Sequence, residues 1–468
     1  MSTTEKLPNA VHAYPIFAGF PKGTFRYAKT VDELKALYPQ LIDIVTAKDI
    51  PASNRIGVSA KDEFIIVPEN EMFTGPSEIL AVVIATTAED AYNIALQIWQ
   101  QKYIEIIPAK DAIVTIQQAI EKNSYLVERR LDRIKDKQMP PQEEFEKLIA
   151  ELNANKNVRK FHYETTTPTQ EQLYLETQCA IATPHEDGME LLAGTQNLNA
   201  TQKSIADCLG LNQSQVTIRC RRIGGGFGGK EGIFEYSCCA AIAANKLQRQ
   251  VSLVLDHRDD IMYTGKRHES LVRGDLYVDI NTKKFLFFDV QAYLDGGYAT
   301  DLSPAVLERL VYHLDQSYHF ESSRFVGRAC KTNLRSNTAF RGFGAPQAVY
   351  FTEMMIQDVA KEMNWCENTL REVNLYQPCD RTPYGQLVGE IPLQECIDQV
   401  TEKSNYGKMK QEVKDFNATH TNLQQGVAIM PLKFGVSFAQ SFLNQGHALV
   451  HVFTDGSVSV SHGGVEMG

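Results

Sequence analysis

The sequence predicts an α+β fold, with a compact N-terminal unit followed by a longer region rich in β-strands. The chain has 468 residues, of which 43% are apolar and 22% charged, enough for a large core and for roughly three domains. Residues 77–109 have the pattern of a strand, a helix and a second strand joined by short links. Strand patterns become frequent from about residue 162 onward. Together these observations favour a mixed architecture.

One amphipathic helix is the clearest element of the N-terminal unit, which we expect over residues 1–125. SEILAVVIA, at 77–85, is predicted to be a strand. Thr86 and Glu89 form a candidate capping box for the helix that follows. The apolar stripe of this helix consists of Ala91, Ile94, Ala95 and Ile98. IEIIPA, at 104–109, is predicted to return as a strand.

Residues 126–160 differ in composition from the segments around them. They are dense in charge and interrupted by Pro140 and Pro141. Such a stretch is typical of a solvated helical linker, so we predict a linker and a domain boundary here.

The second half of the chain alternates short helices and strands. A helix is predicted at 201–210, ended by Gly210, followed by a strand at 215–223. The small apolar residues that follow Glu231 predict a tightly packed helix, and residues 251–260 predict another strand. The glycine-rich stretch GGGFGGKE, at 224–231, therefore falls at a turn from strand to helix.

Charge and composition argue against several functions. The net charge of −10 disfavours nucleic acid or an anionic membrane as the main partner. No apolar run approaches the ~18 residues of a membrane-spanning helix, and the N-terminus lacks the pattern of a secretory signal. The nine cysteines form no C-x-x-C pair. We therefore expect reduced thiols in the cytoplasm, without a zinc or iron–sulfur framework formed by this chain.

The glycine-rich stretch has three interpretations. It matches the start of a nucleotide-binding P-loop, but Glu231 stands where that motif needs Ser or Thr. It could be a tight turn that allows close packing. It could also be a backbone platform for a large anionic cofactor at a helix N-terminus.

A second glycine-rich segment, RSNTAFRGFGAPQA at 335–348, favours the platform. Phe340, Arg341 and Phe343 alternate with glycines there. Arg341 suits bidentate contact with an oxyanion, and the two rings could hold a planar molecule. Ordinary burial of the two phenylalanines is the alternative.

The motifs YLETQ, GTQN, GGGFGGKE, TNLRSNTAFRGFG and HGGVEMG occur in this order. In this the chain resembles the molybdenum-cofactor domain of xanthine dehydrogenases and oxidases, within the molybdenum hydroxylase family that includes aldehyde oxidases. The resemblance implies an α/β-hammerhead domain followed by a molybdenum-cofactor-binding region in two parts, over residues 161–350 and 351–468. It also implies hydroxide attack on a substrate carbon and hydride transfer to the molybdenum centre.

The resemblance assigns a role to each of several residues. Gln196, Phe227, Gly228 and Arg341 match positions that contact the molybdenum–molybdopterin cofactor, and of these Gln196, Phe227 and Arg341 are expected beside the metal. Substrate-binding positions of the family match Glu231, Arg309, Phe340, Phe343 and Phe438.

The substrate follows from two of these positions. Glu231 and Arg309 match a pair that is typical of xanthine-type members, which implies a purine such as hypoxanthine or xanthine rather than an aldehyde. Pairing with Arg309 would also depress the pKa of Glu231. Ala439 stands where the purine-type members have threonine, and Ala345 replaces a glycine of the motif.

The resemblance also predicts which parts of such an enzyme lie elsewhere. The chain ends at Gly468, so the general-base glutamate of the family is expected beyond the C-terminus, and no catalytic base is assigned. The [2Fe–2S] and FAD domains are expected on missing segments or on another chain. The complete enzyme is expected to be a cytoplasmic or peroxisomal homodimer. An aldehyde oxidase and a non-catalytic fragment are the competing hypotheses.

Overall fold

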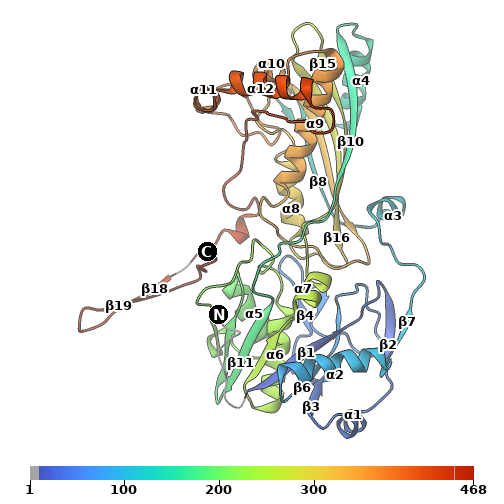
Figure 1. Ribbon diagram of the computed structural model, residues 1–468, viewed down its shortest axis with the longest axis vertical. Coiled ribbons are helices and arrows are strands. Elements are labelled where there is room, and N and C mark those ends of the chain that lie inside the picture. Colours follow the sequence, from blue (N-terminus) through green and yellow to red (C-terminus); the bar gives the residue numbers. More distant parts are fainter. Residues whose placement is uncertain (1–9, 447) are drawn as a thin grey trace.

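The computed structural model describes residues 10–446 and 448–468. It consists of two bodies arranged along the long axis, each built on one β-sheet (Figure 1). The mixed α+β class predicted from the sequence is confirmed. No helix within the described residues is long and apolar enough to cross a membrane.

A seven-stranded sheet forms the first body, in the order β13–β12–β11–β14–β1–β6–β3. Its strands are β1 (Val11–Phe17), β3 (Leu41–Val45), β6 (Ile79–Ala85), β11 (Cys179–His185), β12 (Gly188–Ala193), β13 (Val216–Arg219) and β14 (Val251–Val254). The sheet joins strands from both sides of residues 126–160, so the bodies are not consecutive stretches of chain. The parallel pairing of β1 with β14 makes this connection.

Helices and small strand pairs surround this sheet. They are β2 (Gly23–Tyr27), α1 (Val31–Leu37), β4 (Arg55–Ile56), β5 (Glu63–Phe64), α2 (Ala88–Gln100), β7 (Ile104–Pro108), α5 (Leu198–Leu209), α6 (Glu235–Leu247) and α7 (His257–Tyr263). The predicted tight packing of α6 is confirmed, since every residue from Cys238 to Ala244 is fully buried. Gly210 ends α5 in the left-handed conformation, as predicted.

Two details near α2 differ from the sequence prediction. The hydroxyl of Thr87, rather than Thr86, caps the helix by accepting from the backbone N–H of Asp90 at 3.0 Å. The return strand exists as β7 but pairs with β2 in a separate two-stranded sheet. The residue pattern specified the elements but not the strand partner, which depends on tertiary contacts.

A six-stranded sheet forms the second body, in the order β10–β15–β16–β17–β8–β9. Its strands are β8 (Tyr125–Ile134), β9 (Lys137–Gln138), β10 (Val158–Thr167), β15 (Ser270–Asp279), β16 (Phe285–Gly297) and β17 (Ser322–Lys331). The helices of this part are α3 (Ile116–Glu121), α4 (Gln142–Ala154), α8 (Ser303–Val311), α9 (Ala345–Met363), α10 (Glu367–Asn374), α11 (Leu393–Ser404) and α12 (Tyr406–Thr419).

The prediction of a helical linker over 126–160 is wrong. This segment supplies β8, β9, α4 and part of β10 to the six-stranded sheet. Its charges lie on a sheet face and pair across strands, as Glu128 does with Arg328 of β17 at 2.7 Å. Phe145 of α4 is 1% exposed and stacks on Phe287. The partners are nearly 200 residues away, which explains why local charge density suggested solvent.

The strand predicted at 251–260 is only partly correct. Strand β14 ends at Val254, and Asp256 caps a new helix, α7, by accepting from the N–H of Arg258 at 2.8 Å. Asp259 and Asp260 in the first turn suit the positive end of that helix.

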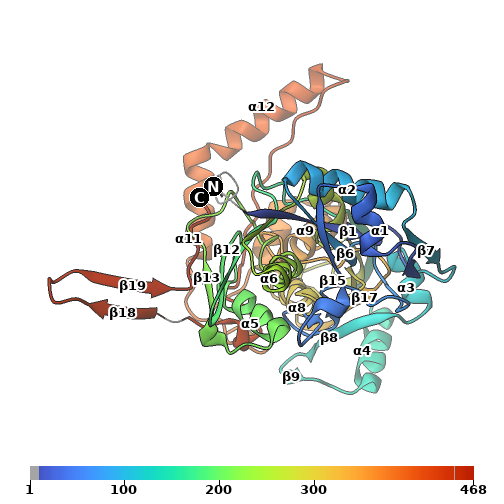
Figure 2. The ribbon, with the colours of Figure 1, turned by 90° about the horizontal axis from the view of Figure 1, so that it is seen from below.

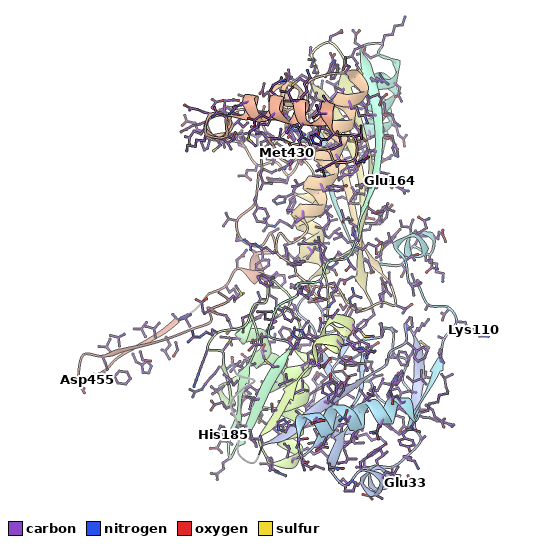
Figure 3. The ribbon with its side chains drawn as sticks, in the orientation of Figure 1. Glu33, Lys110, Glu164, His185, Met430 and Asp455 are labelled. Atoms are coloured by element: carbon purple, nitrogen blue, oxygen red, sulfur yellow. The ribbon has the colours of Figure 1, made fainter. Side chains whose placement is uncertain are left out.

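A hairpin of β18 (Ala448–Val452) and β19 (Val458–His462) extends away from both bodies (Figures 1 and 2). Figure 3 shows Asp455 at its tip, with side chains standing free on both faces. All residues of both strands are exposed.

Candidate functional site

The first glycine-rich segment is the connection between β13 and α6, in which Gly224 and Phe227 are exposed whereas Gly226, Gly228 and Gly229 are buried. Phe227 has a left-handed φ of 53° and is 44% exposed. Gly228 follows with a φ of 103°, and a Cβ there would lie 2.7 Å from the carbonyl carbon of Ala339. Only glycine allows this close approach of the second segment.

Gln196 fixes the shape of the loop. Its Oε1 accepts from the backbone N–H groups of Gly228 at 3.0 Å and Lys230 at 3.2 Å. A Cβ on Gly226 would lie 2.3 Å from the same oxygen. The amide nitrogen Nε2 lies 3.4 Å from Glu231 Oε1. One side of the Gln196 amide therefore organises the glycines, and the other is a donor beside Glu231.

The YLETQ motif supports the loop from behind, and sequence reasoning did not explain its function. Glu176 accepts from the N–H of Gly224 at 3.0 Å and pairs with the buried ammonium of Lys230 at 3.1 Å. Gln178 donates to the carbonyl oxygen of Gly229 at 2.8 Å and to the Tyr174 hydroxyl at 3.0 Å.

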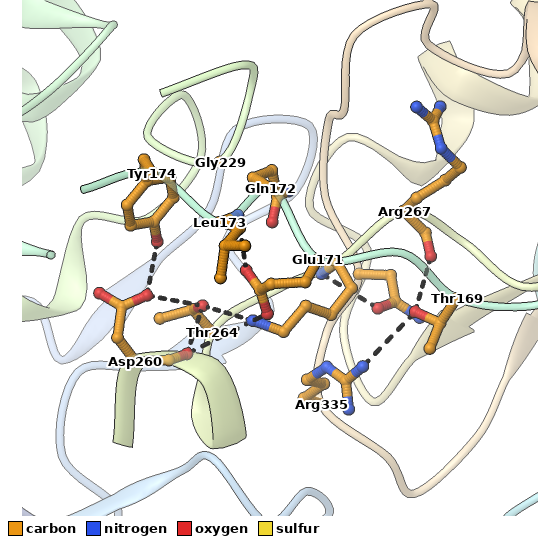
Figure 4. A network of polar contacts seen from close by, with 12 residues as sticks. Thr169, Glu171, Gln172, Leu173, Tyr174, Gly229, Asp260, Thr264, Arg267 and Arg335 are labelled. Atoms are coloured by element: carbon orange, nitrogen blue, oxygen red, sulfur yellow. Dashed lines mark hydrogen bonds and ion pairs between the residues drawn. The ribbon is translucent and has the colours of Figure 1, made fainter. Parts of the chain in front are cut away.

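This support continues into a polar network shown in Figure 4. The Tyr174 hydroxyl donates to Asp260 Oδ1 at 2.7 Å, and Lys266 pairs with Glu171. The network joins Tyr174 of the YLETQ motif to Asp260 of α7. It also joins Glu171, which precedes the motif, to Lys266, which follows α7. The loop therefore rests on a rigid base.

The second glycine-rich segment meets the first one directly. The N–H of Arg341 donates to the carbonyl oxygen of Phe227 at 2.9 Å. Arg341 itself is exposed and forms no ion pair with any described residue. Gln172 donates to the carbonyl oxygen of Ala339 at 3.0 Å, which fixes the segment on its other side.

Arg267 is a residue of this site that the sequence did not reveal. Its guanidinium donates to the carbonyl oxygens of Phe340 and Arg341, at 3.3 and 2.8 Å, and lies 4.1 Å from the Phe340 ring centroid. Burial lowers the pKa of Arg267 to about 10. No local pattern marks this residue, because its partners lie more than 70 positions later in the chain.

The two phenylalanines of the second segment point to different neighbours. Phe340 packs under Arg267, whereas Phe343 makes an edge contact with Phe438 at 5.4 Å between centroids. Phe343 has a left-handed φ of 55°. Phe343 and Phe438 thus form a pair, and Phe340 stands apart from them.

A cavity of about 550 Å³ lies beside the loop, and we call it the Glu231 cavity. Its lining includes Gln196, Glu231, Phe438 and the His462–Gly464 part of the HGGVEMG motif. That motif is held against the loop because Ile223 N–H donates to the carbonyl oxygen of Glu466 at 3.0 Å.

Glu231 is buried near one other acid, Asp301. Burial first, and then the charge of Asp301, raise the pKa of Glu231 to about 7. Asp301 is 3% exposed, and its Oδ1 has no hydrogen-bond partner among the described residues. A Cβ on Gly232 would lie 2.1 Å from that oxygen.

Arg309 does not pair with Glu231, contrary to the sequence prediction. This residue of α8 is 8% exposed and donates to the carbonyl oxygens of Gly435 and Ser437. It lines a second cavity, which also includes Phe438 but not Glu231. The expected depression of the Glu231 pKa is therefore wrong, because burial and, after it, the charge of Asp301 raise that pKa.

These residues fit an oxygen-rich anionic cofactor beside the Glu231 cavity. The Gln196 amide offers a donor, and Arg341 offers an exposed guanidinium without an ionic partner among the described residues. Within the described residues, no group of three His, Cys, Asp or Glu side chains is arranged to hold a metal ion directly.

Two family models, both described as molybdopterin cofactor-binding domain, match residues 139–375 and 399–468. The chain belongs to this family. Xanthine dehydrogenase/oxidase of Gallus gallus is 38% identical over 433 residues, which are 92% of this chain and 30% of the relative. Aldehyde oxidase 4 of Rattus norvegicus is 33% identical over 451 residues, 94% of this chain and 31% of the relative.

A solved structure shows the same fold. The aldehyde oxidoreductase from Desulfovibrio gigas matches 97% of this chain and 49% of its own, with a TM-score of 0.78 and 18% identity. The chain therefore spans about 30% of the curated relatives named above and half of this structure.

The raised pKa of Glu231 leads to a prediction about stability. An acid whose folded-state pKa lies above its ordinary 4.5 destabilises the folded state as pH rises from about 4.5 to about 7, and the full cost is present above that range. Glu231→Gln should therefore increase the free energy of unfolding by about 1–3 kcal/mol near pH 8, and by much less near pH 5.

Urea unfolding at the two pH values measures this difference. Glu186→Gln, at an exposed turn, is the matched control and should leave the free energy of unfolding unchanged at both pH values. Equal effects of Glu231→Gln at both pH values would contradict the assignment of a buried, raised carboxyl.

Proposed function

We propose that this chain is the substrate-oxidising part of a molybdenum hydroxylase and that its substrate binds in the Glu231 cavity. The observation that carries the proposal is the junction of the two glycine-rich segments, where Arg341 N–H donates to the carbonyl oxygen of Phe227. When bound, the molybdenum–molybdopterin cofactor supplies a two-electron oxidation of a substrate carbon, with water as the oxygen source.

The residues of this chain bind and orient the reactants. Arg341 would hold the cofactor, and Gln196 Nε2, which lies 3.4 Å from Glu231 Oε1, would be a donor beside it. Phe343 and Phe438 provide aromatic faces that restrict a planar substrate and exclude water. A protonated Glu231 can donate to a ring nitrogen or carbonyl oxygen, and an ionised one can accept from a ring N–H.

A purine of the hypoxanthine or xanthine type is the proposed substrate, because Glu231 can match both donors and acceptors on such a ring. In this proposal Arg309 does not contact the substrate but positions a neighbouring segment. Its two hydrogen bonds to the carbonyl oxygens of Gly435 and Ser437 hold the segment that carries Phe438. Electrons leave through [2Fe–2S] and FAD domains on other segments or another chain, within a cytoplasmic or peroxisomal homodimer.

Oxidation of an aldehyde is the second candidate. The observation that favours it is the engagement of Arg309 by backbone carbonyls, which leaves Glu231 as the one charged side chain that the structure places in the lining of its cavity. Ala439 points the same way, since it lacks the hydroxyl expected of a purine-binding member.

Oxidation by a complete, cofactor-loaded enzyme that contains this chain, followed with an artificial electron acceptor, separates the candidates. If the substrate is a purine, Glu231→Val should lower kcat/KM for hypoxanthine by about 10- to 100-fold, because a charge-assisted contact is lost, and should leave benzaldehyde oxidation unchanged. The reverse preference would support the aldehyde. Absence of molybdenum-dependent oxidation of both compounds would contradict the proposed function.

A further inference from the structure

A second cavity, of about 850 Å³, shares Phe438 with the Glu231 cavity but has its own walls. We call it the Ser317 cavity. Its walls are the end of α8 with the turn after it, the loop between α10 and α11, and residues 432–439. From this set the proposed function uses Phe438, Ala439, and Arg309 with the carbonyl oxygens of Gly435 and Ser437 that hold it.

A buried ion pair makes the floor of the Ser317 cavity rigid. The ammonium of Lys433 pairs with Asp315, which is 1% exposed, and donates to the Tyr384 hydroxyl at 3.2 Å. The Tyr376 hydroxyl donates to Asp315 Oδ2 at 2.6 Å. The three walls are therefore tied together without a ligand, as a preformed binding site requires.

His313 contributes neither charge nor a free hydrogen-bonding group. Its Nε2 accepts from the N–H of Gly435 at 3.1 Å, so the proton is on Nδ1, which donates to the carbonyl oxygen of Arg309 at 2.7 Å. Burial lowers the pKa of His313 to about 4. Both ring nitrogens are occupied, and the imidazole is neutral near pH 7.

The hydroxyl of Ser317 has no hydrogen-bond partner among the described residues. The residue lines the cavity, is 2% exposed, and its Oγ forms no hydrogen bond to any described residue. Leaving a buried hydroxyl unpaired is costly, so an acceptor placed in the cavity would be stabilised by it.

Aromatic and apolar side chains line the same cavity as this hydroxyl. The rings of Tyr312 and Tyr384 meet edge to face at 5.2 Å. Phe434, Leu387 and Ile391 line the same cavity, although they are 51%, 54% and 42% exposed. Exposed apolar groups that converge on a cavity are typical of ligand sites.

We propose that the Ser317 cavity binds a flat aromatic molecule that carries a hydrogen-bond acceptor, at a site separate from the Glu231 cavity. The volume lies within the range of pockets that hold small organic ligands. The tyrosine and phenylalanine rings select a flat apolar body, and the Ser317 hydroxyl selects its oxygen or nitrogen acceptor. The inference does not depend on the proposed oxidation.

The test uses 2-naphthamide as the probe, with residues 1–468 and no cofactor, and measures binding by ligand-observed NMR and calorimetry. Leu387→Trp fills the mouth of the Ser317 cavity and should abolish saturable binding. Ser317→Ala should weaken binding by about 3- to 10-fold, since one hydrogen bond is lost. Far-UV circular dichroism confirms that each variant is folded.

Gln445→Trp is the matched control, because Gln445 lines the Glu231 cavity and is exposed. It should leave the affinity unchanged. Binding that is lost in Gln445→Trp but retained in Leu387→Trp would place the probe in the Glu231 cavity and overturn the proposal. Binding unaffected by both variants, or no saturable binding by the native chain, would overturn it as well.

Discussion

Replacing Arg341 with alanine is expected to weaken retention of the molybdenum–molybdopterin cofactor by at least about 10- to 100-fold. The backbone of Arg341 is already fixed by Phe227, and its guanidinium is exposed without an ionic partner among the described residues. A charge-assisted contact to an oxyanion contributes about 1.5–3 kcal/mol, which corresponds to that factor.

Molybdenum and pterin are measured per chain after gel filtration of the reconstituted protein. Arg341→Lys keeps the charge but loses the planar fork, so it should retain an intermediate amount. Arg273→Ala, on the remote strand β15, is the control and should behave as the native chain. Full cofactor content in Arg341→Ala would show that this residue does not hold the cofactor.

Gly228→Ala is expected to reduce the free energy of unfolding by about 2–5 kcal/mol. The added Cβ would lie 2.7 Å from backbone atoms of Ala339, and the φ of 103° is unfavourable for any other residue. Backbone strain and overpacking each cost about 1–3 kcal/mol. The contact is with main chain, so no side chain can move to relieve it.

Urea unfolding of Gly228→Ala and Gly389→Ala tests this expectation. A Cβ on Gly389 meets nothing within 4 Å, so that variant should differ from the native chain by less than about 0.5 kcal/mol. Gly226→Ala should fall between them, because its Cβ meets the flexible end of Gln196. Equal stability of the Gly228 and Gly389 variants would refute the close approach of the two glycine-rich segments.

Sequence patterns predicted correctly the elements that are specified by their own residues. Helix α6 was predictable because its small apolar residues allow burial on all sides, and α5 because Gly210 provides a left-handed end. Strand β8 was not, because Glu128 pairs with Arg328 of β17 and Arg129 pairs with Glu308 of α8, which only the folded chain brings near. The hammerhead assignment of residues 1–125 stays a prediction.

The same distinction, between residues in contiguous motifs and residues placed by tertiary contacts, applies to the candidate site. Gln196, Phe227, Gly228 and Arg341 could be found because each belongs to a contiguous motif, and the structure brings them together around one loop. Arg267 and Asp301 belong to no motif and reach the site only through the fold. Arg309 was placed opposite Glu231, but carbonyl oxygens more than 120 residues later engage its guanidinium.

We propose that the loop at 224–231 and the segment at 335–348 together hold the cofactor. The molybdenum and pterin content of residues 1–468 after reconstitution tests this directly, compared across the native chain, Arg341→Ala, Gly228→Ala and Gly389→Ala. We expect close to one equivalent of each per chain in the native protein and Gly389→Ala, and strong loss in the other two. A native chain without cofactor, or equal content in all four proteins, would contradict it.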